Sequence, residues 1–321
     1  MDKPTLTVET FFQLTRDDLD TKISALFTDR TILSVLKGGK RLRPLLAHLA
    51  FKACTQGKET PEEYERALEG AVSIELAHAA SLIHDDVIDR DNERRGKPSF
   101  HVVEGVDTAI LKGHKLLAAG FNIALSHGND VAKLYVNTWN DILSGELDEV
   151  TLNKQDIEEA VESFATSRIF ETYRDIIKRK TASLFSSACR AGAIEANMVG
   201  DILEVFAHYG MEIGMAYQLA DDLVDLTKGE LLPSVVLPLI NKLENKTIMP
   251  NRLTKRKIKK IVTKHANHIQ EMYLEEIKTH IRRAEKLSTS TLVHESPYKQ
   301  LLKQAPTYII NKMLQENHLS V

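Results

Sequence analysis

The stretch ELAHAASLIHDDVIDRDNERRGKPSFH, residues 75–101, joins a nearly continuous apolar segment to a dense cluster of charge. The charged residues that decide its reading are Asp85, Asp86, Asp89, Arg94 and Arg95. On a helix Asp85 and Asp89 share one face a turn apart, and Asp86 neighbours Asp89 on the same side. Carboxylates this close repel one another unless a cation lies between them, and Mg²⁺ combines one or two carboxylates with substrate phosphates. The stretch therefore predicts a buried helix that ends at a Mg²⁺ site.

A second helix repeats this arrangement. The stretch GMAYQLADDLVDL, residues 214–226, follows apolar residues with aspartates at the same spacing: Asp221, Asp222 and Asp225. Gln218 precedes Asp221 and Asp222 by one helical turn and so lies on their face. One acidic helix end is usually only solvated. Two of them on separate apolar helices indicate facing carboxylate sets, bridged by Mg²⁺ to a diphosphate.

Basic residues suited to contacts with a diphosphate occur in several places. The stretch KGGKRLRP, residues 37–44, offers three behind a glycine pair: Lys40, Arg41 and Arg43. Arg94 and Arg95 follow the first acidic motif, and arginine suits bidentate phosphate contacts. His78 lies two helical turns before Asp85 on the same face, as a further donor. Each residue alone is more often a surface charge or a core histidine, but beside paired acidic motifs they predict an anion site.

The chain as a whole predicts successive helices. Its 321 residues contain nine prolines, none of them between residues 99 and 232, and that stretch is rich in helix-forming residues. No alternating pattern with hairpin turns occurs, so a sheet is not expected. The expected breaks are short, at residues 55–63, 95–107, 126–130, 147–155, 226–233 and 243–252. We therefore expect an all-α bundle that forms a single domain over residues 1–321.

Composition narrows the class of protein. Apolar residues make up 43% of the chain, and a net charge of −3 argues against nucleic acid as a partner. The two cysteines, Cys54 and Cys189, lack metal-type spacing, so we expect reduced thiols in a core. The first residues contain no apolar signal region, and no window approaches ~18 uninterrupted apolar residues. A cytoplasmic protein without a membrane span is expected.

With these motifs the chain resembles the trans-isoprenyl diphosphate synthases, the polyprenyl synthetase family. The resemblance covers roughly residues 30–240 and rests on the order of GGKRLRP, ELAHAASLIHDDVIDRDNERRGKP, YRDIIKRKTASLF and HYGMEIGMAYQLADDLVD. It implies an all-α bundle, homodimeric, with a deep cavity between the two aspartate helices. It also implies that three Mg²⁺ ions bind with the allylic diphosphate.

The resemblance also implies roles for individual residues. The expected Mg²⁺ ligands are Asp85, Asp86, Asp89, Asp221, Asp222 and Asp225. The residues expected to hold isopentenyl diphosphate are Lys40, Arg43, His78 and Arg95. The residues expected to contact the allylic substrate are Arg94, Lys180, Thr181 and Gln218, with Lys180 counted among the catalytic residues.

The implied reaction is a head-to-tail (1'-4) condensation of isopentenyl diphosphate with an allylic diphosphate. In the family a bulky aromatic four or five positions before the first aspartate stops chain growth early. This sequence has Ser81 and Ala80 there, and Ala77 lies further down the helix. Ser81 and Ala77 lie about 6 and 12 Å below Asp85 along the axis. Since none of the three is bulky, we expect an all-trans product of C20 or longer.

Departures from the family pattern keep other hypotheses open. His114 occupies a position that is usually acidic, and the lysines that usually follow the second aspartate motif are missing. One alternative is a diverged member that acts as a binding or partner subunit. Another is a terpene cyclase or a peptide prenyltransferase, which ionise an allylic diphosphate but need no isopentenyl site. Retention of Lys40, Arg43, His78 and Arg95 favours the synthase.

Overall fold

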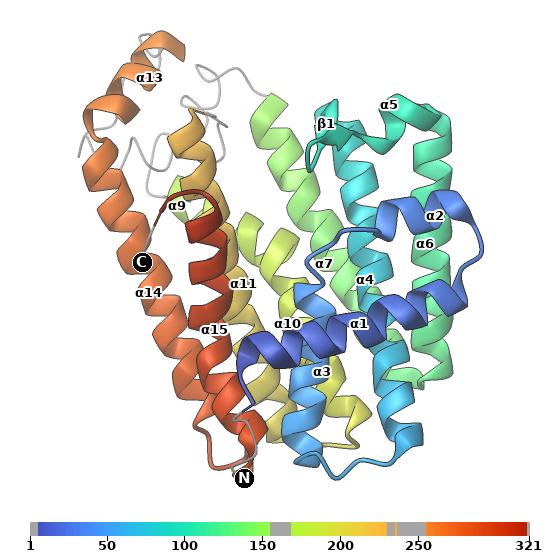
Figure 1. Cartoon of the computed structure of the whole chain (residues 1–321). Coiled ribbons are helices and arrows are strands. Elements are labelled where there is room, and N and C mark those ends of the chain that lie inside the picture. Colours follow the sequence, from blue (N-terminus) through green and yellow to red (C-terminus); the bar gives the residue numbers. More distant parts are fainter. Residues whose placement is uncertain (1–5, 155–167, 230–234, 236–254, 320–321) are drawn as a thin grey trace.

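Long helices make up the computed structural model of the chain, which describes residues 6–154, 168–229, 235 and 255–319 (Figure 1). The helices of the first half are α1 Val8–Leu26, α2 Arg30–Leu36, α3 Leu42–Thr55, α4 Pro61–Asp89, α5 Phe100–Glu104, α6 Val106–Ser126 and α7 Asn129–Lys154. Those of the second half are α9 Arg168–Ile177, the π-helical turn η1 Lys178–Ala182, α10 Ser183–Glu195, α11 Asp201–Lys228, α13 Lys255–Lys264, α14 Ala266–Ser288 and α15 Pro297–Glu316. The all-α prediction is confirmed.

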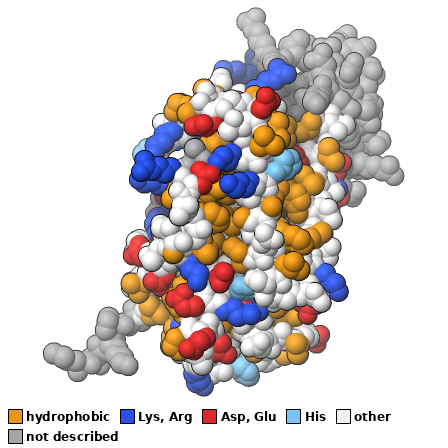
Figure 2. Space-filling model, turned by 90° about the vertical axis from the view of Figure 1, so that its right-hand side faces the viewer, with side chains coloured by type: hydrophobic (Ala, Val, Ile, Leu, Met, Phe, Trp, Pro, Cys, Tyr) orange, Lys and Arg blue, Asp and Glu red, His pale blue; other side chains and the backbone are white. Residues whose placement is uncertain are grey.

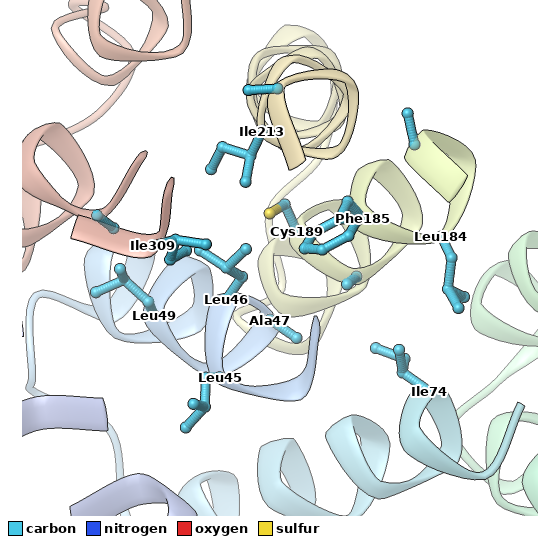
Figure 3. Packing of buried hydrophobic residues seen from close by; sticks show 14 of the residues in the cluster. Leu45, Leu46, Ala47, Leu49, Ile74, Leu184, Phe185, Cys189, Ile213 and Ile309 are labelled. Atoms are coloured by element: carbon cyan, nitrogen blue, oxygen red, sulfur yellow. The ribbon is translucent and has the colours of Figure 1, made fainter. Parts of the chain in front are cut away.

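Most long helices stand side by side, while α1 crosses in front of α3 and α4 (Figure 1). The helix α10 lies between α3, α4 and α11, and side chains from these helices meet around Phe185 and Cys189 (Figure 3). Glycines allow very close approach here. A Cβ on Gly192 would lie 1.9 Å from the carbonyl oxygen of Ala47, and one on Gly210 would lie 2.2 Å from that of Phe185. These contacts fix α3 and α11 directly against α10.

The helix α4 has clear start and stop signals. Thr60 caps its first turn and forms a reciprocal capping box with Glu63, and Pro61 occupies the first helical position. Its middle turns are buried, as the nearly continuous apolar pattern predicts. The helix ends at Arg90, which adopts a left-handed conformation with φ 60°. The first aspartate motif is therefore held on the last two turns of a buried helix.

The C-terminal helices are part of the same packing. The helix α14 lies along α11, and α15 contacts α3, α11 and α14. Tyr209 of α11 donates a hydrogen bond of 2.7 Å to the carbonyl oxygen of Leu302 in α15. None of the helices in the described ranges combines the length and the apolar character that a bilayer span needs.

Two details differ from the sequence prediction. A short hairpin pairs β1, Glu93–Arg94, with β2, Lys97–Pro98. Its turn residues Arg95 and Gly96 both have positive φ, 54° and 72°, as a two-residue hairpin turn requires. The break expected at residues 147–155 is wrong, because α7 continues to Lys154. That segment contains neither glycine nor proline to end the helix. The break expected at 243–252 lies outside the described residues.

Candidate active site

The first wall of the site is the end of α4. Asp86 is buried, with 3% of its surface exposed, and its Oδ1 accepts hydrogen bonds from both Nε and Nη2 of Arg94, the former at 2.7 Å. The hairpin that carries Arg94 therefore folds back onto the aspartate motif. Since Arg94 neutralises Asp86, the carboxylates left to face the interior of the site are Asp85 and Asp89.

Asp85 and Asp89 have the electrostatics of a cation site. Burial raises the pKa of the Asp85 carboxyl to about 7; Glu146 and Asp89 add to the rise, and Lys180 opposes it. Burial also raises the pKa of Asp89, and Lys180 again opposes the rise. Carboxylates destabilised by burial and by like charges are stabilised by a bound cation.

The second wall is α11, where Asp222 is buried and held by neighbours. Its Oδ2 accepts a hydrogen bond from the hydroxyl of Tyr173, and its Oδ1 accepts one of 2.9 Å from Nε2 of Gln218. Burial raises the pKa of Asp222 to about 7 although both hydrogen bonds lower it. Thr181 in turn donates a hydrogen bond of 2.7 Å to Oε1 of Gln218. The structure thus brings Thr181 and Gln218 together at the second motif. The other two aspartates of this motif, Asp221 and Asp225, are half-buried.

Lys180 lies between the two walls. Its Nζ is 2.7 Å from Oε2 of Glu146 and 2.5 Å from Oε2 of Glu149, both on α7. Asp85 of the first wall acts electrostatically on Lys180, and Glu149 acts on both Asp89 and Asp222. The sequence reasoning missed both glutamates, because Glu149 fell within the break predicted at residues 147–155 and Glu146 directly before it.

The lysine sits on an unusual turn. Residues Lys178–Ala182 form a π-helical turn, a feature that is found mostly at functional sites. A Cβ on Gly145 of α7 would lie 2.7 Å from the backbone nitrogen of Lys180. This glycine therefore allows α7 and the π-helical turn to pack in direct backbone contact.

A cationic corner lies beside the aspartate walls. Arg43 of α3 is buried, its guanidinium lies 4.3 Å from the centre of the Phe185 ring, and its Nη1 is 3.1 Å from Nε2 of His78. Since a guanidinium only donates, His78 accepts through Nε2. Burial and the nearby arginines hold the pKa of His78 well below its usual value, so it is neutral. Asp221 and Arg95 both act electrostatically on Arg43. The predicted isopentenyl residues Arg43, His78 and Arg95 therefore lie together.

The glycine-rich loop before α3 is anchored by a buried ion pair. Arg41, only 4% exposed, donates from Nη1 to Oε1 of Glu75 at 2.6 Å and from Nε to Asp20 at 3.0 Å. A Cβ on Gly39 would lie 2.8 Å from Nη1 of Arg41 and 3.1 Å from Oε1 of Glu75, so a side chain there would press on this ion pair. The exposed Lys40 pairs with Glu316 of α15 at 2.6 Å. Arg41 therefore fixes the loop. Lys40 faces outward, and Arg43 faces inward.

A small apolar cavity of about 30 Å³ lies below the site, between α4, α7 and α10. Its walls include Ala77 on α4, Trp139 and Ile142 on α7, and Leu184 on α10. Ala77 lies two turns below Asp85, and Ile142 one turn below Glu146, so the cavity continues the inner faces of both helices.

The other residues predicted to set chain length lie elsewhere. Ala80 is fully buried in the core, and Ser81 donates a hydrogen bond of 2.9 Å to the carbonyl oxygen of His78. Neither lines the cavity. His114 on α6 lies near His84, with 5.1 Å between the ring centroids and 58° between the ring planes. Residues 230–240, which follow the second motif and lack the lysines that the family usually has there, are outside the described ranges except for Val235.

The donor set fits Mg²⁺ chemically. Among the residues that the structure describes, no three His, Cys, Asp or Glu side chains are gathered closely enough to ligate one ion by themselves. Mg²⁺ typically takes one or two carboxylates and completes its shell with water and phosphate. The carboxylates of the first motif with raised pKa values, the half-buried Asp85 and the more exposed Asp89, meet that requirement. Asp86 and Asp222 are already engaged by protein donors.

Known proteins resemble this chain over much of its length. A geranylgeranyl diphosphate synthase of Methanosarcina mazei is 33% identical over 197 residues, which cover 60% of this chain and 56% of that protein. A short chain isoprenyl diphosphate synthase of Methanocaldococcus jannaschii is 35% identical over 189 residues, covering 59% and 54%. The matched region thus spans about half the length of these relatives.

Solved structures share the fold. A geranylgeranyl pyrophosphate synthetase from the archaeon Geoglobus acetivorans matches with a TM-score of 0.75 over 94% of this chain and 99% of that one, at 22% identity. The Polyprenyl synthetase family profile matches residues 27–231, more than half of the chain, and this range contains both aspartate motifs, Lys180 and the cationic corner. The chain belongs to the polyprenyl synthetase family.

Proposed function

We propose that the protein is a prenyltransferase that condenses isopentenyl diphosphate with an allylic diphosphate, head to tail, giving an all-trans polyprenyl diphosphate. One observation carries the proposal. The two aspartate walls, with Lys180 between them, lie beside a separate cationic corner and above an apolar cavity. An enzyme that joins the hydrocarbon parts of two diphosphate substrates needs two anion sites. It also needs one apolar chamber for the growing hydrocarbon chain.

Different residues of the chain are placed to bind the two diphosphates. Lys180 and Gln218 lie where they can bind the allylic diphosphate between the walls, and Arg43 and Arg95 can bind the second diphosphate. We propose Mg²⁺, three ions as in the family resemblance, as the cofactor. Bound at the aspartates, it would stabilise the negative charge that develops on the departing diphosphate. The apolar walls of the cavity exclude water from the reacting carbon.

The cationic corner favours this function over the alternatives. A cyclase or a peptide prenyltransferase also ionises an allylic diphosphate, but neither needs a second diphosphate site. Here the buried Arg43 has an Nε without a hydrogen-bond partner among the described residues, and His78 and Phe185 orient its guanidinium. A buried arginine with a spare donor is well suited to bind an anion.

The α4 wall of the apolar cavity supports a product of C20 or longer. No aromatic side chain of α4 enters it, because the helix contributes Ser73, Ile74 and Ala77. We propose that Trp139 and Tyr135 on α7 limit product length in this chain, since they are the largest side chains of the lining.

We further propose that the chain is one domain and acts as a homodimer. An apolar face over α5, α6 and α7 supports the dimer (Figure 2). Its exposed hydrophobic side chains are Val102, Val103, Val106, Ile110, Leu111, Leu125, Val136, Leu143 and Leu147. Apolar surface of this extent usually marks an interface. Leu111→Glu, at a residue that is 68% exposed, should give monomers in analytical ultracentrifugation.

Release of diphosphate tests the proposed function. The purified protein is incubated with Mg²⁺ and dimethylallyl, geranyl, farnesyl or geranylgeranyl diphosphate, with and without isopentenyl diphosphate. We expect fast release only when both substrates are present. Fast release from an allylic diphosphate alone would support a cyclase, and no release in any mixture would support a binding or partner subunit.

A further inference from the structure

Two glutamates on α7 face the aspartate walls but belong to neither motif. Glu146 and Glu149 lie one helical turn apart on one face, and both contact the ammonium of Lys180. Glu146 is buried, at 7% exposure, and its side chain is ion-paired without a well-aligned hydrogen bond to any described residue. A buried carboxylate with a single cationic partner is costly, so this placement calls for an explanation.

The backbone fixes the pairing. The π-helical turn that carries Lys180 packs against Gly145, where a Cβ would lie 2.7 Å from the Lys180 nitrogen and 3.0 Å from the Cβ of Arg179. Lys180 is thus set directly opposite the glutamate face of α7. Its next electrostatic neighbour is Asp85 on the first wall.

We propose that Glu146 and Glu149 are positioning residues, which hold the ammonium of Lys180 between the walls and keep it from pairing with Asp85. A lysine released from the glutamates would turn to the carboxylates of the first wall on which it already acts, Asp85 and Asp89, and would compete there with Mg²⁺. Held in place, it can meet the diphosphate. This inference rests on the proposed function, because it assumes that Asp85 binds Mg²⁺ and that a diphosphate enters the site.

The same two elements provide a matched control. Asp148 lies between the two glutamates in sequence, but its side chain is exposed and pairs with Arg179, the neighbour of Lys180, at 2.5 Å. Asp148→Asn removes the same charge from the same helical turn without touching Lys180. Any effect of Glu149→Gln through general electrostatics should therefore appear in Asp148→Asn as well.

The experiment measures Mg²⁺ binding without turnover. Trp139 is the single tryptophan and lines the cavity below the glutamates, so its fluorescence can report occupancy. The full-length protein is titrated with Mg²⁺ in the presence of farnesyl thiodiphosphate, which does not ionise readily. We expect Glu149→Gln and Glu146→Gln to raise the Mg²⁺ concentration at half-saturation about tenfold, and Asp148→Asn to change it less than about twofold.

A double-mutant cycle separates positioning from charge. If the glutamates act through Lys180, Glu149→Gln should have less than about a twofold effect in a Lys180→Gln background. An equal effect in both backgrounds would overturn the inference, as would an equal shift in Asp148→Asn. Because Glu146 is buried, its variant can fail to fold, and the partly exposed Glu149 then carries the test alone. If the wild-type protein shows no Mg²⁺-dependent binding of the analogue, the proposed function fails and the inference with it.

Discussion

The hydroxyl of Tyr173 on α9 donates a hydrogen bond to Oδ2 of Asp222 on α11. The phenol of Tyr273 on α14 is hydrogen-bonded to Tyr173 in turn. Since the Tyr173 proton is directed to Asp222, Tyr273 donates to the Tyr173 oxygen. The C-terminal part of the chain, which carries no readable motif, therefore supports the second aspartate motif.

Loss of this support should weaken the enzyme more than the fold. Tyr273→Phe removes a buried hydrogen bond worth about 1 kcal/mol, and we expect kcat/KM for the allylic diphosphate to fall about three- to tenfold. The control is Tyr209→Phe, which removes the buried hydroxyl that donates to Leu302 at the other end of α11. It should lower the unfolding free energy by a similar amount and leave kcat/KM unchanged. Equal kinetic losses in both variants would contradict a specific role for Tyr273.

The raised pKa of Asp85 predicts a pH dependence of stability. The pKa of this carboxyl is about 7 in the folded protein, against an ordinary value of 3.8 for an aspartate. As pH rises, the Asp85 carboxyl therefore loses its proton in the unfolded chain before it does so in the folded protein. The stability that the bound proton gives the folded protein is lost as pH rises through 7. Asp85→Asn has no such proton to lose. The unfolding free energy of each protein is measured in urea without Mg²⁺. From pH 4 to pH 8, the value for Asp85→Asn should rise by up to about 4 kcal/mol relative to that of the wild type.

The difference between the two proteins is the quantity to measure, because other groups titrate equally in both. It should grow with pH and level off above pH 7. A difference that stays constant over this range would show that the Asp85 carboxyl has an ordinary pKa.

The cavity wall should control product length. Ala77→Phe places an aromatic ring in the cavity two turns below Asp85, and we expect the main product to shorten by one or more five-carbon units. Trp139→Ala enlarges the cavity and should lengthen the product. Val136→Ala, an outward-facing change on the same helix at a residue 42% exposed, is the control. Chromatography of the dephosphorylated products measures all three, and an unchanged product with Ala77→Phe would place chain growth elsewhere.

The buried pair of Arg41 and Glu75 should matter for both stability and substrate binding. Glu75→Gln leaves a buried guanidinium with only Asp20 as a charged partner, which should cost about 3 kcal/mol of unfolding free energy. The loop that carries Lys40 and leads into α3, where Arg43 lies, should loosen, so KM for isopentenyl diphosphate should rise while kcat changes little.

An exposed ion pair provides the comparison for this variant. Glu275 pairs with Arg282 on α14, and both side chains are more than half exposed, at 68% and 63%. Glu275→Gln should cost less than about 1 kcal/mol and leave KM unchanged. A Glu75→Gln protein as stable as Glu275→Gln would contradict the anchoring role of the buried pair.

The sequence was sufficient for the parts of the site that depend on local pattern. Helical spacing places Asp85 and Asp89 on one face, and the apolar residues before them predict the burial of α4. The spacing also puts Gln218 beside Asp222, where the structure has it bonded at 2.9 Å. These relationships hold within a single helix, so periodicity alone determines them.

Relationships between distant helices could not be predicted in this way. Tyr273 reaches the second motif only because α14 packs along α11, and no local signal marks it. Glu149 fell within a predicted break and Glu146 directly before it, although the absence of glycine and proline at residues 146–154 could have indicated a continuing helix. The contact between Nη1 of Arg43 and Nε2 of His78 could not be predicted either, because only the fold brings these two residues together.

A double-label condensation tests the central claim most directly. The protein is incubated with Mg²⁺, ³H-labelled farnesyl diphosphate and ¹⁴C-labelled isopentenyl diphosphate, and the labels are counted in the separated product. We predict both labels in one polyprenyl diphosphate of C20 or longer, with the ¹⁴C label lost when Arg43 is changed to Gln. Recovery of farnesyl diphosphate without ¹⁴C, or of a product that carries ³H alone, would contradict the account.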